Sequence, residues 1–227
     1  MYPKSELFLR KNDSMKKLLR AMIACVLAVI VIVGAVLIVK TINRPKTSTF
    51  GMRSTASAIS PADADASDEE IKAYAKSVIE VMANRDYIAL SGIVHEDFGV
   101  VFSPYSTVSL ATNLCFTAEQ IANFEGDDEK YIWGVYDVDG APIEMTPGEY
   151  FDEFVFDADF TKCENFGVDE ILSSGNALEN ITEVFPNARF VDCYMPDGDN
   201  WNSLHLVFEE KDGKLWLTAI IHSEYTI

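Results

Sequence analysis

The stretch "SLHLVFEEKDGKLWLTAIIH", residues 203–222, decides the fold predicted for this chain. Apolar and polar residues alternate on both sides of Asp212-Gly213, the pair preferred by a two-residue type I′ turn, so we expect a long antiparallel hairpin. Pairing Lys211 with Lys214 places Phe208 opposite Leu217. In this register, the residues on one face are Leu204, Leu206, Phe208, Leu217, Ala219 and Ile221, and those on the other are His205, Val207, Glu209, Trp216, Thr218 and Ile220. One face is therefore predicted to be core and the other mixed.

Upstream of the hairpin, the sequence predicts one long helix. Ser67 followed by Glu70 forms a capping box, which is typical of a helix N-terminus. The apolar stripe that follows has helical periodicity and ends near Asn84. Its members are Ile71, Tyr74, Ala75, Val78, Ile79 and Met82.

Shorter elements lie between this helix and the hairpin. We expect short helices over 87–93 and after capping boxes at 117–120 and 146–149, and strands at 99–103, 131–136, 141–145 and 188–195. The turns "DVDG" and "DGDN" do not complete a calcium-binding loop. This order predicts an α+β domain with helices on one face of a curved antiparallel sheet, similar to the NTF2-like, or cystatin-like, cone.

Three stretches carry a family resemblance: "HEDFGVVFSPYS", "YIWGVYDVDGAPIEMTPGEYFDEFVFD" and "LHLVFEEKDGKLWLTAIIHSEYTI". They resemble an uncharacterised extracytoplasmic domain of Gram-positive bacterial lipoproteins and membrane-anchored proteins. The resemblance implies an NTF2-like domain outside the cytoplasm and brings no known activity or catalytic residue. The chain differs from the lipoprotein members because an apolar run takes the place of a lipid anchor.

The run "AMIACVLAVIVIVGAVLIV", residues 21–39, contains no charge or proline. At about 1.5 Å per residue it matches a hydrocarbon core roughly 30 Å thick, so we expect a transmembrane helix, with a cleavable signal peptide as the alternative. More basic residues precede the run than follow it, which favours a cytoplasmic N-terminus. The predicted organisation is a cytoplasmic basic tail (1–20), the span (21–39), a flexible linker (40–66) and an extracytoplasmic acidic domain (67–227).

The charge of the chain restricts its partners. The formal net charge is −18, and all but two of the 36 Asp and Glu residues follow residue 53. So acidic a domain repels phosphate groups, which argues against a nucleic-acid partner. The predicted partners are the lipid bilayer, through residues 21–39, and basic envelope proteins or cations.

The cysteines do not form a recognisable pattern. Cys115, Cys163 and Cys193 fall in the acidic part, an odd number without close spacing or a CxxC zinc motif. We therefore expect no obligatory disulfide bond.

The stretch "HEDFGVVFSPYS", residues 95–106, combines a histidine, two adjacent carboxylates, a serine and a tyrosine, which are residue types found in catalytic sites. Consecutive strand residues point to opposite faces, so His95 and the two acids after it do not converge on one substrate atom. Ser103 precedes a proline and lacks a nucleophile elbow. We expect Phe98 to be buried with the following strand, and we predict no catalytic residue, no metal site and no cofactor. The candidate binding residues are His95, Tyr105 and His222, as the rim of one pocket.

These features favour a single-pass membrane protein that displays a non-enzymatic binding or sensing domain outside the cytoplasm. One alternative is a structural assembly factor of a type IV secretion-like envelope machine, because such machines contain a component with a short tail, one span and an NTF2-like outer domain. The other alternative is an envelope hydrolase that uses a pocket in the cone.

Overall fold

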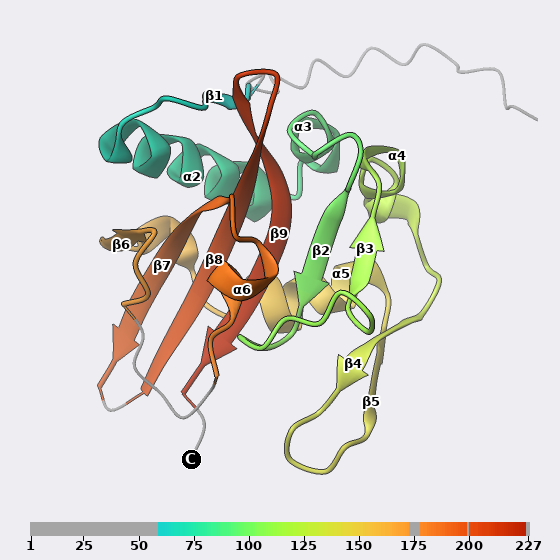
Figure 1. Ribbon diagram of the computed structural model, residues 1–227. Coiled ribbons are helices and arrows are strands. Elements are labelled where there is room, and N and C mark those ends of the chain that lie inside the picture. Colours follow the sequence, from blue (N-terminus) through green and yellow to red (C-terminus); the bar gives the residue numbers. More distant parts are fainter. Residues whose placement is uncertain (1–58, 173–177, 199, 226–227) are drawn as a thin grey trace, which may run out of the picture. The chain divides into compact units, whose positions relative to one another are not determined.

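The computed structural model describes residues 59–172, 178–198 and 200–225 (Figure 1). The strands are β1 (Ala62–Asp63), β2 (Val100–Ser103), β3 (Leu114–Phe116), β4 (Tyr131–Val135), β5 (Pro142–Met145), β6 (Asn165–Val168), β7 (Arg189–Asp197), β8 (Asn200–Lys211) and β9 (Lys214–Glu224). The helical elements are α2 (Asp68–Ala83), α3 (Tyr87–Ser91), α4 (Ala118–Ile121), α5 (Pro147–Tyr150), α6 (Ile181–Val184), the π-helix η2 (Phe151–Val155) and the 3₁₀ turns η1 (Phe124–Gly126) and η3 (Phe160–Lys162).

A seven-stranded sheet organises the domain, in the order β3-β2-β9-β8-β7-β6, with β1 paired to the start of β9. β2 and β9 run parallel, whereas the other pairs in this sheet are antiparallel. β4 and β5 form a separate two-stranded sheet. Figure 1 shows α2 behind the large sheet and α6 in front of it.

This arrangement corrects the predicted fold class. The domain is α+β, but the sheet is mixed rather than antiparallel, helices lie on both of its faces, and a second sheet is present. It is therefore not the predicted NTF2-like or cystatin-like cone. The alternation of apolar residues indicates which side chains are buried, but it does not indicate the direction in which a short strand such as β2 joins its neighbour.

The long helix forms as predicted. The Ser67–Glu70 capping box is present, and all six residues of the predicted apolar stripe are buried.

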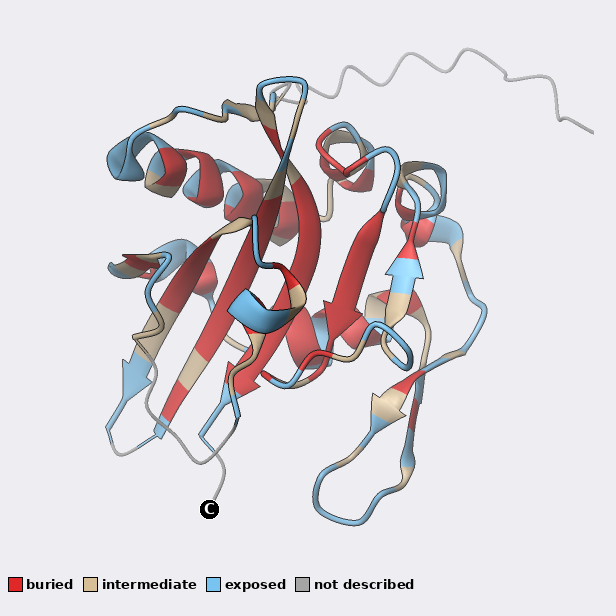
Figure 2. Ribbon diagram, in the orientation of Figure 1, coloured by how far each residue is buried: buried red, intermediate tan, exposed pale blue. Residues whose placement is uncertain are grey.

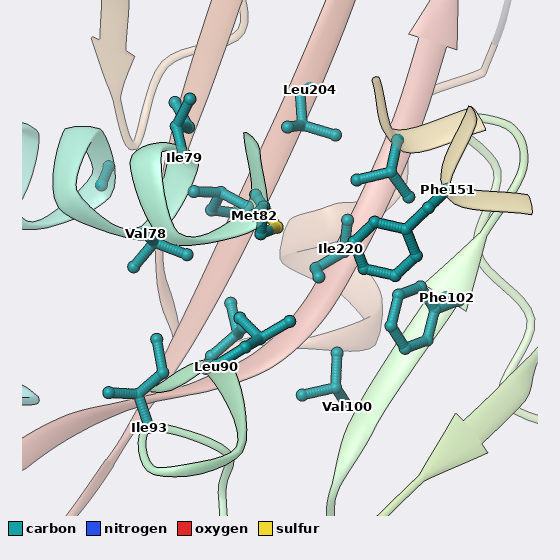
Figure 3. Close-up of a cluster of buried hydrophobic side chains, with 14 of the residues drawn as sticks. Val78, Ile79, Met82, Leu90, Ile93, Val100, Phe102, Phe151, Leu204 and Ile220 are labelled. Atoms are coloured by element: carbon teal, nitrogen blue, oxygen red, sulfur yellow. The ribbon is translucent and has the colours of Figure 1, made fainter. Parts of the chain in front are cut away.

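Figure 3 shows Met82 of α2 beside Leu204 and Ile220, which come from β8 and β9. The same core contains an aromatic group in which the ring of Phe102 packs edge-on against Trp133 at a centroid distance of 5.7 Å. This face of the sheet is therefore closed by apolar packing.

The hairpin follows the predicted register only near its turn. Asp212 and Gly213 have positive φ angles of 54° and 75°, as a type I′ turn requires, and Phe208 lies opposite Leu217. A β-bulge then follows, because Val207 pairs with Ala219 and leaves Thr218 as the additional residue.

The bulge reverses the faces of the distal half of β9. Ile220 and His222 lie on the α2 face with Leu204 and Leu206, whereas Ile221 lies on the opposite face. The predicted face assignment is therefore wrong from Thr218 onward.

The stretch at residues 95–106 is partly as expected. Val100 and Phe102 are fully buried in β2. Phe98 is 62% exposed, which contradicts the prediction that it is buried. Gly99, with a φ of 76°, turns the chain between Phe98 and the strand, so the aromatic side chain stays outside.

The predicted tail at 1–20, the span at 21–39 and the linker as far as residue 58 lie outside the described residues. Among the residues that the structure does describe, no helix is both long and apolar enough to cross a membrane. The end of the predicted linker is attached to the domain, because Ala62 and Asp63 pair with Leu215 and Lys214.

Candidate binding site

The second face of the sheet carries a small apolar group and, next to it, buried polar side chains. The apolar group includes Phe190, Val207 and Ala219 and packs against Ile181 of α6. Farther along the same strands the inward-facing residues become polar. Figure 2 shows β8 and β9 buried over most of their length, whereas β7 becomes exposed toward its end.

We call these residues the polar cluster. Strand register brings Asp192 of β7 opposite His205 of β8, and Ser203 of β8 opposite Ser223 of β9, all on one face. Glu179 contributes from the segment before α6. The complete polar cluster consists of Ser106, Glu179, Asp192, Ser203, His205 and Ser223.

Asp192 is the centre of the polar cluster and is fully buried. Its carboxylate accepts hydrogen bonds from the Ser203 hydroxyl and, at 2.7 Å, from the backbone N–H of Leu172. Nδ1 of His205 lies 3.9 Å from the same carboxylate. Burial lowers the pKa of His205, and the charge of Asp192 only partly offsets this effect, so the imidazole is neutral at pH 7.

Glu179 lies at the edge of the polar cluster and is only half-buried. Its Oε1 accepts a hydrogen bond from the Ser223 hydroxyl at 3.4 Å. Burial, together with the negative charge of Asp192, raises the pKa of Glu179 to about 7. Glu179 therefore changes its charge close to neutral pH.

Four buried polar atoms of the polar cluster make no hydrogen bond of standard geometry among the described residues. They are Oγ of Ser106, Oε2 of Glu179 and both ring nitrogens of His205. Ser106 nevertheless lies close enough to Glu179 for its hydroxyl to lower the pKa of that carboxyl, so these two side chains face each other. Buried polar atoms in proteins are nearly always bonded to protein, water or a ligand. These atoms are therefore available for hydrogen bonds to water or to a ligand.

The three residues proposed from sequence do not come together. His95 is buried near the hairpin turn, where its backbone N–H donates to the carbonyl of Leu217 and its Nδ1 accepts from the N–H groups of Asp97 and Phe98 at 3.3 Å each. Its ring is tilted against that of Phe98. His95 thus stabilises the turn before β2 and lies away from the other two.

Tyr105 and His222 share a neighbour at the distal end of β9. The ring of Phe154 packs edge-on against both, with centroid distances of 6.1 Å to Tyr105 and 5.6 Å to His222. The hydroxyl of Tyr105 accepts a hydrogen bond from the backbone N–H of Asp137 at 3.3 Å. Two of the three predicted residues therefore pack against the same aromatic ring, and the prediction of a shared pocket rim stays a prediction.

His222 is 2% exposed and is held on both sides of its ring. Nδ1 lies 2.9 Å from the carbonyl oxygen of Pro104, and Nε2 lies 3.3 Å from Oδ2 of Asp157. Burial alone lowers the pKa of His222, but Asp157, the Pro104 carbonyl and Glu224 together outweigh it and raise the pKa. His205 and His222 lie on opposite faces because of the bulge, so they cannot share a ligand.

Comparison of the chain with known proteins gives no family: no protein-family model matches it, and neither does a curated protein or a solved structure.

Sequence reasoning missed the polar cluster. The available signal was His205 and Ser203 alternating with Leu204 and Leu206 in a strand, together with Asp192 at the centre of an apolar strand. A charged residue inside a buried strand requires a partner, which is a reason to search for one on neighbouring strands.

Proposed function

We propose that this chain is a single-pass membrane protein whose acidic domain lies outside the cytoplasm and binds a small organic ammonium compound in the polar cluster, without catalysing a reaction. The membrane location is supported by the apolar run at 21–39, the basic residues before it and the resemblance of the domain to extracytoplasmic domains of Gram-positive bacteria. The binding role is supported by the structure of the polar cluster.

The observation that carries the binding proposal is the set of four unsatisfied buried atoms. The Asp192 carboxylate and the hydroxyls of Ser203 and Ser223 complete the polar cluster around them. Within the described residues, no Lys or Arg forms an ion pair with Glu179. An ammonium group supplies the positive charge, and it supplies hydrogen-bond donors for the Glu179 carboxylate, the Ser106 hydroxyl and the one unprotonated ring nitrogen of the neutral His205.

The position of Glu179 provides a route for the ligand. Asp192, Ser203 and His205 are fully buried, whereas Glu179 is half-buried and borders solvent. A ligand that enters beside Glu179 meets its carboxylate first and stabilises the ionised form. Binding should therefore strengthen as the pH rises through about 7.

The hydrolase alternative lacks the necessary contact. Ser203, Asp192 and His205 are the residue types of a catalytic triad, but the Ser203 hydroxyl donates to Asp192 and not to His205. Among the described residues, no hydrogen bond joins a serine or cysteine side chain to a histidine ring. The secretion-machine alternative depended on an NTF2-like architecture, which the mixed sheet does not have.

The test is a thermal-shift titration of the detergent-solubilised full-length chain at pH 8 and pH 5.5. Ethanolamine serves as the ammonium probe, and ethylene glycol is its neutral counterpart. We expect ethanolamine alone to raise Tm, and more at pH 8. Glu179→Gln should abolish the shift, whereas Glu183→Gln, which changes an exposed glutamate on nearby α6, should preserve it.

Equal shifts with both probes, or an unchanged shift in Glu179→Gln, would contradict the ammonium site. The location is tested separately by adding protease to intact cells stripped of their wall. Cleavage before β1, within residues 41–61, should release the acidic domain into the medium. Protection of the whole chain would contradict the proposed orientation.

A further inference from the structure

A second group of polar side chains lies at the distal end of β9, on the face opposite the polar cluster. It consists of Asp157, which follows η2, and of His222 and Glu224 of β9. One ligand atom from each of the three residues lies within 4.8 Å of the others. In the described part of the chain, no other three His, Cys, Asp or Glu residues approach one another so closely.

The hydrogen bonding of His222 determines which ring nitrogen faces the carboxylates. The carbonyl oxygen of Pro104 can only accept a hydrogen bond, so Nδ1 of His222, 2.9 Å away, carries a proton and donates it. In the neutral ring, Nε2 then holds a lone pair that points at Oδ2 of Asp157. Either a proton on Nε2 or a metal ion bound to both atoms satisfies this contact, in which Nε2 and Oδ2 lie 3.3 Å apart.

The same geometry is common among metal-binding histidines. A backbone carbonyl that accepts from Nδ1–H fixes the tautomer and the ring orientation, and leaves Nε2 to coordinate the ion. The edge-on contact with Phe154 and the near-complete burial of His222 restrict the ring further. His222 is thus oriented before any ligand arrives.

The two carboxylates are available to a cation. Asp157 accepts a hydrogen bond from the Asn202 side-chain amide, which orients its carboxylate. Within the described residues, neither Asp157 nor Glu224 forms an ion pair with a lysine or arginine. Glu224 is exposed at the end of the strand, so water can fill the remaining coordination positions.

We propose that Asp157, His222 and Glu224 bind one divalent transition-metal ion, of the class of Mn²⁺ or Zn²⁺. An imidazole nitrogen with two carboxylates suits these ions better than Mg²⁺ or Ca²⁺, which prefer oxygen ligands alone. Small side-chain rotations bring three atoms within 4.8 Å of one another to the usual distances of about 2.0–2.2 Å from one ion. The ion would join η2 to the end of β9.

This site is independent of the proposed ammonium site. The bulge at Thr218 places His222 on the α2 face and the polar cluster on the other face. Either proposal can therefore fail without the other.

The experiment is equilibrium dialysis of the detergent-solubilised full-length chain against Mn²⁺ or Zn²⁺ alone, with elemental analysis of the bound ion. Mn²⁺ is included because thiolates bind it poorly, so the free cysteines do not contribute. We expect one ion per chain. His222→Gln and Asp157→Asn should each weaken binding at least tenfold, whereas Asp128→Asn, which removes an exposed carboxylate elsewhere, should leave it unchanged.

Glu224→Gln provides the second test, because this exposed side chain can be changed without disturbing the core. It should also weaken Mn²⁺ binding, and Tm measured without metal should remain that of the wild type. The proposal is overturned if no ion binds, if His222→Gln binds Mn²⁺ as the wild type does, or if Ca²⁺ binds equally well and independently of His222.

Discussion

The two faces of the large sheet bury different kinds of side chain. The α2 face is filled by aliphatic and aromatic side chains, among them Phe102, Leu217 and Ile220. The opposite face combines a small apolar group with Asp192, Ser203 and His205, which are equally buried. Apolar burial stabilises a fold directly, whereas buried polar groups do so only where every partner is present. The first face is therefore expected to contribute more to stability, and the second is the face on which we propose a binding site.

The largest expected effect is on the apolar face. Leu217→Ala should lower the free energy of unfolding by about 2–5 kcal/mol, because Leu217 is fully buried opposite Phe208. Chemical denaturation of the full-length chain measures the loss. Leu110→Ala is the control, because this leucine is 61% exposed and should change stability little. A small effect at Leu217 would show that the α2 face is not the main source of stability.

A smaller loss is expected from the polar face. Asp192→Ala leaves the Ser203 hydroxyl and the Leu172 N–H without their acceptor, which costs about 1–3 kcal/mol. Removing this negative charge should also lower the pKa of Glu179, which an apolar contact could not do. Denaturation and a pH titration of stability report the two effects. If the pKa of Glu179 is the same in Asp192→Ala as in the wild type, the charges of Asp192 and Glu179 do not interact.

The third prediction concerns the pH dependence of stability, which arises from Glu179 on the polar face. The folded-state pKa of Glu179 is about 7, above its unfolded value of 4.5, so its contribution is present below pH 4.5 and is lost as the pH rises through 7. Because glutamine does not ionise, the Glu179→Gln variant should not lose this stability as the pH rises. At pH 8 the variant should be more stable than the wild type by about 1 kcal/mol, after allowance for solvent screening at a half-buried site.

At pH 4 the two proteins should have the same stability, and Glu183→Gln should follow the wild type throughout. Thermal melting across this pH range provides the measurement. A variant that is less stable at pH 8 would mean that ionised Glu179 stabilises the fold.

The smallest effect concerns the thiols. Cys163 and Cys193 are buried, Cys115 is exposed, and all three are free. Mild reductant should therefore leave Tm unchanged, since no disulfide bond constrains the domain. A drop in Tm of several degrees on reduction would contradict this and would imply a disulfide bond that links the elements.

Much of the local structure could be predicted from sequence. Capping boxes fixed the starts of α2, α4 and α5, because the side chain and backbone that bond are three residues apart. The Asp212-Gly213 turn fixed the hairpin and its first pairs for the same local reason. The buried stripe of α2 followed from its periodicity.

The candidate sites could be predicted less well from the sequence. Tyr105 and His222 were singled out and lie against one aromatic ring, but Asp157, the partner of His222, was not recognised, because it meets His222 only through folding. The polar cluster combines residues from β7, β8, β9 and two loops, and its pairings depend on a sheet order that local patterns do not encode.

The sequence by itself determined the acidic charge, the apolar run at 21–39, the long helix and the hairpin turn, since each depends on composition or on residues close in the chain. Only the tertiary structure decided the parallel pairing of β2 with β9 and the bulge at Thr218. Because side chains alternate along a strand, the additional residue Thr218 moves every later side chain of β9 to the other face of the sheet. It separated His205 from His222 and so placed the two polar sites on opposite sides of one sheet.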